Sequence, residues 1–184
     1  MVKALVIIDM LQGYMKDTDN PEEVIENQIK LIKEFKNHNL PVILSIPDTK
    51  QTTQNPVMFR LWGQEFKDDP EGKKLIKELT EVEYDNVVQK SEYSAFYKTD
   101  LEKYCKQNNI DEMYFTGVFC GCCVFFSAVD AAYRHIQPYL VRDAAGSPRK
   151  SLVSEGFRRE TLEKFETTIG PLVTTEELIN NLCG

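Results

Sequence analysis

The sequence predicts an α/β domain with three layers, in which helices cover both faces of a Rossmann-like, mostly parallel sheet of about six strands. Apolar segments of strand length alternate along the chain with segments of helical spacing. The strand segments are almost continuously apolar, as expected for parallel strands that are buried on both faces. The 184 residues contain no linker or internal repeat, so we expect a single domain over residues 1–184.

The elements are predicted in chain order from these signals. The first strand covers residues 4–8, and Asn20-Pro21-Glu22-Glu23 then begins a helix as a capping box with proline in the first turn. Thr99-Asp100-Leu101-Glu102 is a second capping box, and its helix stops at Asn108 and Asn109. The further strands are predicted at 41–46, 86–89, 113–118, 138–141 and 172–173, and the further helices at 71–79, 122–134, 150–165 and from 174–177 onward.

Composition excludes several classes of partner. Lys and Arg total 22 against 29 Asp and Glu, which gives a net charge of -7 and a pI near 5.0. Phosphate backbones and anionic lipids attract basic surfaces, so we expect no nucleic-acid partner and no membrane surface. The uncharged stretch from Met113 to Val129 is shorter than the ~20 apolar residues of a membrane-spanning helix, and we interpret it as a buried strand that leads into a buried helix.

The cysteine pattern favours a reducing compartment. The five cysteines are an odd number, and three of them crowd into residues 120–123. A secreted disulfide framework has an even number of cysteines spread along a shorter chain. No signal peptide is visible, because the first apolar run is short and ends at Asp9. We therefore expect a cytoplasmic protein with reduced thiols.

Chemistry-bearing side chains follow several of the predicted strands. Ligands of open α/β sheets bind at the carboxyl ends of the strands, near the point where the strand order reverses. The residues delivered there, in chain order, are Asp9, Gln12 and Tyr14, then Asp48, then Lys90, then the turn over residues 117–123. An acid, a base and a thiol are thus expected to converge from three strand ends.

Each of the three side chains has an ordinary structural explanation when taken alone. A buried cysteine usually acts as a small apolar residue, an aspartate caps a turn, and a lysine is solvated. Cys123, however, lies in the first turn of a predicted helix, where free amides and the helix dipole favour a thiolate. A thiol beside both Asp9 and Lys90 can lose its proton to the carboxylate and be held charged by the ammonium.

Three segments carry a resemblance to a known family. These are Ala4 to Gln12, which ends in Asp-x-x-Gln, then Lys90 to Phe96, which reads Lys-x-x-x-Ser-Ala-Phe, and the turn from Gly117 to Val124. In order and spacing they resemble the isochorismatase-like cysteine hydrolases, the group that contains nicotinamidases and N-carbamoylsarcosine amidases. The resemblance extends along nearly the whole chain and implies a hydrolase whose members usually self-associate, so we expect a homo-oligomer.

The resemblance also implies roles for individual residues. It makes Cys123 the nucleophile, Asp9 its proton acceptor and Lys90 the cation between them. It implies a cis peptide bond between Val118 and Phe119, which would aim the Phe119 amide, together with the Cys123 amide, at an oxyanion. The candidate substrate-binding residues are Gln12, Tyr14, Trp62, Phe96 and Phe119.

Departures from the family pattern narrow the expected activity. The stretch Asp48-Thr49-Lys50 lacks the histidines of the nicotinamidase metal site, and the only histidines of the chain are His38 and His135. We therefore expect no metal and no cofactor, and doubt nicotinamidase activity. Cys120 and Cys122 lack the partner pair and spacing of a zinc site, and we interpret them as packing residues. Isochorismatases lack the nucleophilic thiol, so Cys123 argues against vinyl-ether hydrolysis.

The sequence thus predicts a cysteine-dependent hydrolase of the C–N bond of a small amide or N-carbamoyl compound, with a thioester intermediate and a small-molecule substrate. Three alternatives stay open at this point. The first is a non-catalytic member that binds a small molecule or a protein, and the second is an isochorismatase-type hydrolase. A thiol redox role that uses Cys120 or Cys122 is the third.

Overall fold

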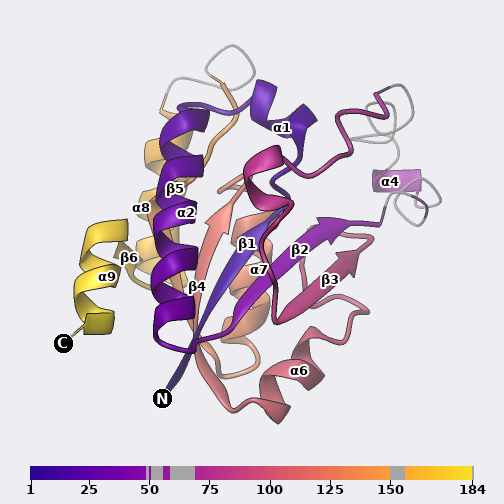
Figure 1. Ribbon diagram of the computed structural model, residues 1–184. Coiled ribbons are helices and arrows are strands. Elements are labelled where there is room, and N and C mark those ends of the chain that lie inside the picture. Colours follow the sequence, from indigo (N-terminus) through magenta and orange to yellow (C-terminus); the bar gives the residue numbers. More distant parts are fainter. Residues whose placement is uncertain (49, 51–55, 59–68, 150–155, 184) are drawn as a thin grey trace.

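The computed structural model describes residues 1–48, 50, 56–58, 69–149 and 156–183. Its centre is a six-stranded sheet in the order β3-β2-β1-β4-β5-β6, and every neighbouring pair is parallel (Figure 1). The strands are β1 (Val2–Ile8), β2 (Val42–Pro47), β3 (Asn86–Lys90), β4 (Ile110–Gly117), β5 (Gln137–Ala145) and β6 (Leu172–Val173). The predicted α/β sheet is confirmed.

Helices cover the two faces of this sheet. The described helices are α1 (Gln12–Lys16), α2 (Pro21–Asn37), α4 (Pro56–Met58), a 3-10 helix (Lys77–Leu79), α6 (Leu101–Gln107), α7 (Cys123–Ala132), α8 (Phe157–Thr168) and α9 (Thr175–Cys183). Figure 1 shows α2 on one face and α7 on the other, and α9 packs beside α2. The expected three layers are thereby present.

The central strand β1 is buried on both sides. Leu5 and Ile7 belong to the apolar cluster beneath α2, whereas Ala4, Val6 and Ile8 belong to the cluster beneath α7. All five side chains are fully enclosed. Alternate residues of a strand point to opposite faces, so a continuous apolar run is what a strand between two cores requires.

The predicted helix over 71–79 is wrong. Most of that segment is a turn, and only Lys77–Leu79 is helical, as a 3-10 helix. The backbone instead pairs with the segment after β1: the Gln12 amide donates to the Lys74 carbonyl, and the Gly13 amide donates to the Gly72 carbonyl. A Cβ on Gly13 would lie 3.2 Å from the Gly72 Cα, so two glycines allow this close approach.

Both predicted capping boxes are also wrong, although both helices exist. Asn20 adopts the left-handed conformation, with φ of 45°, and its side chain caps no amide of α2. Before α6 the hydroxyl of Thr99 accepts a bond from Leu101, while Glu102 binds Lys106 and Arg134. Neither pair makes the reciprocal bonds of a capping box.

The last helix start does form such a box. The Thr174 amide donates to the Glu177 carboxylate at 2.7 Å, and the Glu177 amide donates to the Thr174 hydroxyl at 3.2 Å. Glu177 consequently has a lowered pKa, because the Thr174 amide and hydroxyl donate to its carboxylate. Two orphan amides are satisfied at the start of α9.

The strand order fixes where a site can form. β1 is followed in the sheet by β2 and β3 on one side and by β4, β5 and β6 on the other, so the order reverses between β1 and β4. The crevice outside the carboxyl ends of the strands at such a point is the usual ligand site. Among the described residues, no helix is long and apolar enough to cross a membrane.

Candidate active site

The carboxyl ends of three strands deliver the three predicted side chains. Asp9 directly follows β1 and has a left-handed backbone with φ of 52°. Lys90 is the last residue of β3, and Cys123 is the first residue of α7, after the turn that follows β4. The predicted placement of each residue relative to its element is confirmed.

These side chains meet at the Lys90 ammonium. The Nζ atom of Lys90 lies 2.7 Å from Oδ2 of Asp9 and donates a hydrogen bond of 3.3 Å to the Sγ atom of Cys123. It also donates to the carbonyl of Glu92 at 3.1 Å. All three donor hydrogens of the ammonium can therefore be used at once, which fixes its position.

The three groups differ in their access to solvent. The side chains of Lys90 and Asp9 are only 3% and 1% exposed. Cys123 is partly exposed. Cys123 is thus the least enclosed residue of the three, while the charged pair that it contacts stays sheltered from water.

Burial and charge shift the three pKa values in a coupled way. Burial raises the pKa of Asp9, and the Lys90 ammonium only partly offsets this effect. Burial opposes the charge of Lys90, but Asp9 and Cys123 outweigh it, and its pKa rises. Burial and the Asp9 carboxylate hold the pKa of Cys123 well above 9.0 despite Lys90.

These directions change one expectation from the sequence. The sequence led us to expect that the helix N-terminus favours a thiolate at Cys123, whereas burial and the Asp9 carboxylate act in the other direction and raise the pKa of Cys123. Lys90 remains charged, and the pKa values of Asp9 and Cys123 are both raised by burial in a shared, sheltered site. A carboxylate with a raised pKa is a stronger base, which suits it for removing the thiol proton.

The turn after β4 is tied to the rest of the sheet by its backbone. The Val118 amide donates to the carbonyl of Ile8, and the Cys120 amide donates to the carbonyl of Gly146. The peptide bond between Val118 and Phe119 is cis, as the resemblance implies. Gly117 has φ of 100°, a conformation that favours glycine.

The amides of Phe119 and Cys123 are the predicted oxyanion donors of this turn. Within the described part of the chain, neither the Phe119 amide nor the Cys123 amide donates a hydrogen bond to another loop or turn. The amide of Cys123 is one of the free donors at the start of α7. The two amides come from the segment that positions the sulfur, which is the arrangement expected of an oxyanion hole.

The structure places the predicted substrate-binding residues in different surroundings. Tyr14 on α1 packs against Phe119, with ring centroids 5.8 Å apart. Gln12 is the first residue of α1 and is partly buried. Phe96 is 3% exposed and belongs to the core cluster under α7, where it packs below Arg134. Trp62 lies outside the described residues, and the substrate role of all five residues remains a prediction.

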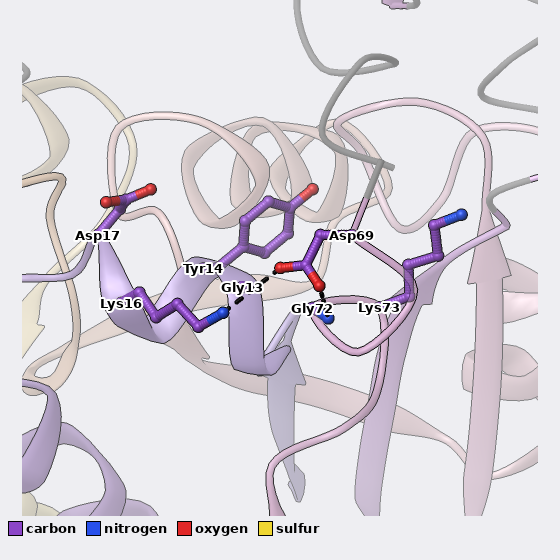
Figure 2. A pocket seen from close by; sticks show the side chains of 7 residues that line it. All are labelled: Gly13, Tyr14, Lys16, Asp17, Asp69, Gly72 and Lys73. Carbon is purple, nitrogen blue, oxygen red and sulfur yellow. Dashed lines mark hydrogen bonds and ion pairs between the residues drawn. The ribbon is translucent and has the colours of Figure 1, made fainter. Parts of the chain in front are cut away.

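A small hollow adjoins Tyr14. It has a volume of about 120 Å³ and is formed where the segment after β1 meets residues 69–73. Figure 2 shows Lys16 reaching toward Asp69, and Asp69 accepting a bond from the Gly72 amide. Because the Tyr14 ring lines this hollow and also packs on Phe119, the hollow lies beside the candidate oxyanion turn.

The two other cysteines of the turn have packing surroundings. Cys120 is fully buried and its Sγ lies 2.9 Å from the hydroxyl of Ser147. Cys122 precedes α7 and packs against the core cluster under α2. Burial raises the pKa of both thiols. Among the described residues, no group of three or more His, Cys, Asp and Glu is placed to hold a metal.

Sequence reasoning missed the residues that join the Lys90 segment to α7. The Ser127 hydroxyl donates to the Cys123 carbonyl and accepts from the Ala95 amide, at 2.6 and 2.9 Å. Ser94 donates to Asp130. A signal was available, because Ser127 lies four residues after Cys123 on the same helix face and Ser94 is part of the Lys-x-x-x-Ser-Ala-Phe segment.

The sheet order and the strand-end residues define an α/β protein of the isochorismatase type. The model of the isochorismatase domain matches residues 3–177, and the chain belongs to this family. The resemblance inferred from the three segments is thus confirmed.

Relatives and solved structures agree with this assignment. Enterobactin synthase component B of Escherichia coli (strain K12) is 29% identical over 181 residues, which cover 96% of this chain but only 62% of that protein. A cysteine hydrolase from Pseudomonas syringae pv. phaseolicola has the same fold, with a TM-score of 0.84 at 18% identity and coverage of 98% of this chain and 92% of that one.

One solved structure is more similar in sequence. N-carbamoylsarcosine amidase from Thermoplasma acidophilum is 26% identical, with a TM-score of 0.77 and coverage of 96% of this chain and 98% of that one. The similarity therefore extends over nearly the full length of both chains.

Proposed function

We propose that this protein is a cysteine-dependent hydrolase of the C–N bond in a small amide or N-carbamoyl compound. The membership in the isochorismatase family supports a hydrolase as the enzyme class. The observation that carries the proposal is the position of the Lys90 ammonium, 2.7 Å from Asp9 and 3.3 Å from the Cys123 sulfur. A base, a cation and a nucleophile within hydrogen-bonding reach meet the geometric requirement for covalent catalysis.

In the first half of the reaction Cys123 attacks the substrate carbonyl carbon. Asp9 accepts the thiol proton as the carbon–sulfur bond forms, and Lys90 stabilises the negative charge on the sulfur. The electrons of the carbonyl bond move to its oxygen, which the amides of Phe119 and Cys123 hold as an oxyanion. The oxyanion collapses, the C–N bond breaks, and Asp9 returns its proton to the departing nitrogen. Ammonia or an amine leaves, and a thioester remains on Cys123.

Water completes the cycle in the second half. Asp9, again a carboxylate, accepts a proton from water as the water oxygen bonds to the thioester carbon. The same two amides hold the second oxyanion. The carbon–sulfur bond then breaks, the acid or carbamate product leaves, and the proton on Asp9 returns to the sulfur. No cofactor takes part in these steps.

The proposed substrate class rests on the chemistry of the site and on one relative. A thiol with a neighbouring carboxylate and two free amides suits acyl transfer, because each step needs only a proton acceptor and an oxyanion site. The similarity to N-carbamoylsarcosine amidase over 96% of this chain supports a small N-carbamoyl or amide substrate. The whole protein's substrate is therefore proposed as a class and not as one compound.

The test is a panel of small primary amides and N-carbamoyl amino acids, with ammonia release measured by a coupled assay. We expect turnover of at least one compound by the wild-type protein. Cys123→Ala is expected to lose this turnover while its circular dichroism and melting temperature stay near the wild-type values. Cys122→Ala is the matched control, because it changes the neighbouring thiol without touching the Lys90 ammonium, and we expect it to stay active.

Two further measurements on the same variants separate the alternatives. Incubation with iodoacetamide followed by peptide mass spectrometry is expected to place the adduct on Cys123. Ammonia release by Cys123→Ala at the wild-type rate would refute the cysteine mechanism. A vinyl ether, followed by release of its carbonyl product and hydrolysed equally by wild type and Cys123→Ala, would instead favour an isochorismatase-type reaction.

A further inference from the structure

A single buried hydroxyl connects the nucleophile to the segment that carries Lys90. The Ser127 side chain on α7 is fully enclosed. Its Oγ donates to the Cys123 carbonyl at 2.6 Å and accepts from the Ala95 amide at 2.9 Å. Cys123 begins α7, and Ala95 lies in the turn that follows β3 and Lys90. One oxygen atom therefore joins two segments that meet at the candidate active site.

A second contact fastens the same segment to the next turn of α7. The Ser94 hydroxyl donates to the carboxylate of Asp130, and it accepts from the Phe96 amide at 3.1 Å. Asp130 is itself held by Arg134, with an N–O distance of 3.3 Å. The backbone of residues 94–96 is thus bound to α7 at two successive turns.

The bond to the Cys123 carbonyl alone would be ordinary. Serine in a helix often donates to the carbonyl four residues earlier, and this bond then stays within the helix. Here the same hydroxyl also accepts an amide from outside α7, so both its donor and acceptor capacities are used in a fully buried place. A buried hydroxyl used in this way fixes the distance between the two segments it joins.

We propose that Ser127 is a positioning residue, which with Ser94 holds the Lys90 ammonium at bonding distance from the Cys123 sulfur. The inference rests on the proposed function, because it assigns a purpose to that distance. Lys90 and Cys123 are 33 positions apart in the chain, and their contact is 3.3 Å long. Loss of the Ser127 link frees the segment after Lys90 to shift, and small misplacements of reacting groups slow catalysis strongly.

The test measures thiol reactivity, which needs no knowledge of the substrate. The rate of Cys123 alkylation by iodoacetamide is followed from pH 6 to pH 10, with the modified residue located by tandem mass spectrometry. Lys90 lowers the pKa of Cys123, so a displaced ammonium leaves this pKa higher. We expect Ser127→Ala to alkylate roughly tenfold more slowly near neutral pH, with its pH profile displaced to higher pH. Ser127→Thr, which keeps the hydroxyl, is expected to restore most of the rate.

The matched control is Thr116→Val in β4. Thr116 is also fully buried and its hydroxyl donates to the carbonyl of Val6 at 3.1 Å, so this bond joins β4 to β1 and not α7 to the Lys90 segment. This variant is expected to lose a similar hydrogen bond and to keep the wild-type alkylation profile. With a hydrolysable amide in hand, Ser127→Ala should lower kcat and leave KM nearly unchanged.

Ser94→Ala provides a second reading if Ser127→Ala does not fold. It removes the bond from the same segment to Asp130 of α7. We expect its alkylation pH profile to move to higher pH by less than that of Ser127→Ala. Wild-type alkylation profiles in the folded serine variants would overturn the inference. Absence of amide turnover in the wild-type protein, together with a displaced profile in Ser127→Ala, would contradict the proposed function and still support the positioning of the sulfur by Ser127.

Discussion

The Lys90 ammonium lies 2.7 Å from the carboxylate of Asp9, and the two side chains are 3% and 1% exposed. No other described ion pair of the protein is so completely enclosed. Removing both charges from water is costly, and their attraction offsets that cost only while both partners are present. The pair is therefore a feature whose removal affects both stability and chemistry.

Stability is expected to depend on Lys90 far more than on a surface lysine. Lys90→Met leaves the Asp9 carboxylate buried without its partner, and we expect a loss of ~3–5 kcal/mol in the free energy of unfolding. Lys36→Met is the control, because Lys36 pairs with Asp85 at 2.8 Å on the surface and should cost no more than ~1 kcal/mol. Urea unfolding of the two variants measures the difference. Equal losses would show that the enclosed pair contributes no more than the exposed one.

Asp9→Asn is expected to separate proton transfer from thiol acidity. Without a proton acceptor, hydrolysis should fall by ~10²–10⁴ in kcat. The Asp9 carboxylate raises the pKa of Cys123, so the same variant should form the thiolate at lower pH than wild type. The two readouts are amide turnover and the pH profile of iodoacetamide alkylation. Asp111→Asn, a surface change that keeps an acceptor for the Val2 amide, should alter neither of them. Retained turnover in Asp9→Asn would remove Asp9 from the mechanism.

The pH dependence of activity follows from the raised pKa of Asp9. Burial raises this pKa above the ordinary 3.8, and the carboxylate must be unprotonated to accept the thiol proton. We expect kcat/KM to fall on acidification with a midpoint above 3.8, measured over pH 4–9 with a neutral substrate. A profile that stays flat down to pH 4 would contradict this role.

As the pH falls through the folded-state pKa of Asp9, we expect kcat/KM to fall but the contribution of Asp9 to the free energy of unfolding to rise. Because the folded-state pKa of Asp9 exceeds its unfolded value, the folded protein binds this proton more tightly. Its contribution to stability is fully present below the unfolded pKa and is lost as pH rises through the folded pKa. The melting temperatures of wild type and Asp9→Asn are compared at the acidic pH where kcat/KM is half its maximum. If the wild type melts no lower than Asp9→Asn at that pH, unfolding is excluded as the cause of the lost activity.

Gly117→Ala tests the turn that carries the candidate oxyanion amides. A Cβ at this position would lie 2.1 Å from the Ile8 carbonyl oxygen, and the backbone has φ of 100°. Backbone cannot move aside as a side chain can, so we expect more than ~3 kcal/mol of destabilisation or failure to fold. Gly121→Ala is the comparison, since its Cβ would meet only side-chain atoms, the ring of Phe157 at 2.9 Å and the Thr161 hydroxyl at 3.2 Å. Equal melting temperatures in the two variants would refute the requirement for glycine at 117.

The sequence was sufficient for the sheet and for the positions of the three candidate catalytic side chains. Continuous apolar runs identified the central strands such as β1, because a strand between two cores needs such a run. Strand ends then located Asp9, Lys90 and Cys123, since parallel strands place their carboxyl ends along one edge. The family segments predicted the cis peptide bond before Phe119, which the structure contains.

Non-local contacts explain what sequence reasoning missed. The segment over 71–79 has local helical character, yet its backbone bonds to residues 10–13 and leaves only a short 3-10 helix. Asn20 looked like a helix cap, but its left-handed backbone turns the side chain away from the amides of α2. Ser127 was overlooked because its second partner, the Ala95 amide, is brought to it only by the fold. The raised pKa of Cys123 could not be foreseen either, because its causes, burial and the Asp9 carboxylate, are brought together only by the fold.

The order of the strands has a consequence for how the molecule matures. Asp9 follows β1, Lys90 ends β3, and Cys123 follows β4, so the trio draws on both halves of the sheet. No fragment that stops before α7 contains all three groups. Until the strands have assembled around it, the Cys123 thiol of a nascent chain has neither Asp9 nor Lys90 beside it. The chemical behaviour of one sulfur atom thus reports whether the ends of β1, β3 and β4 have come together.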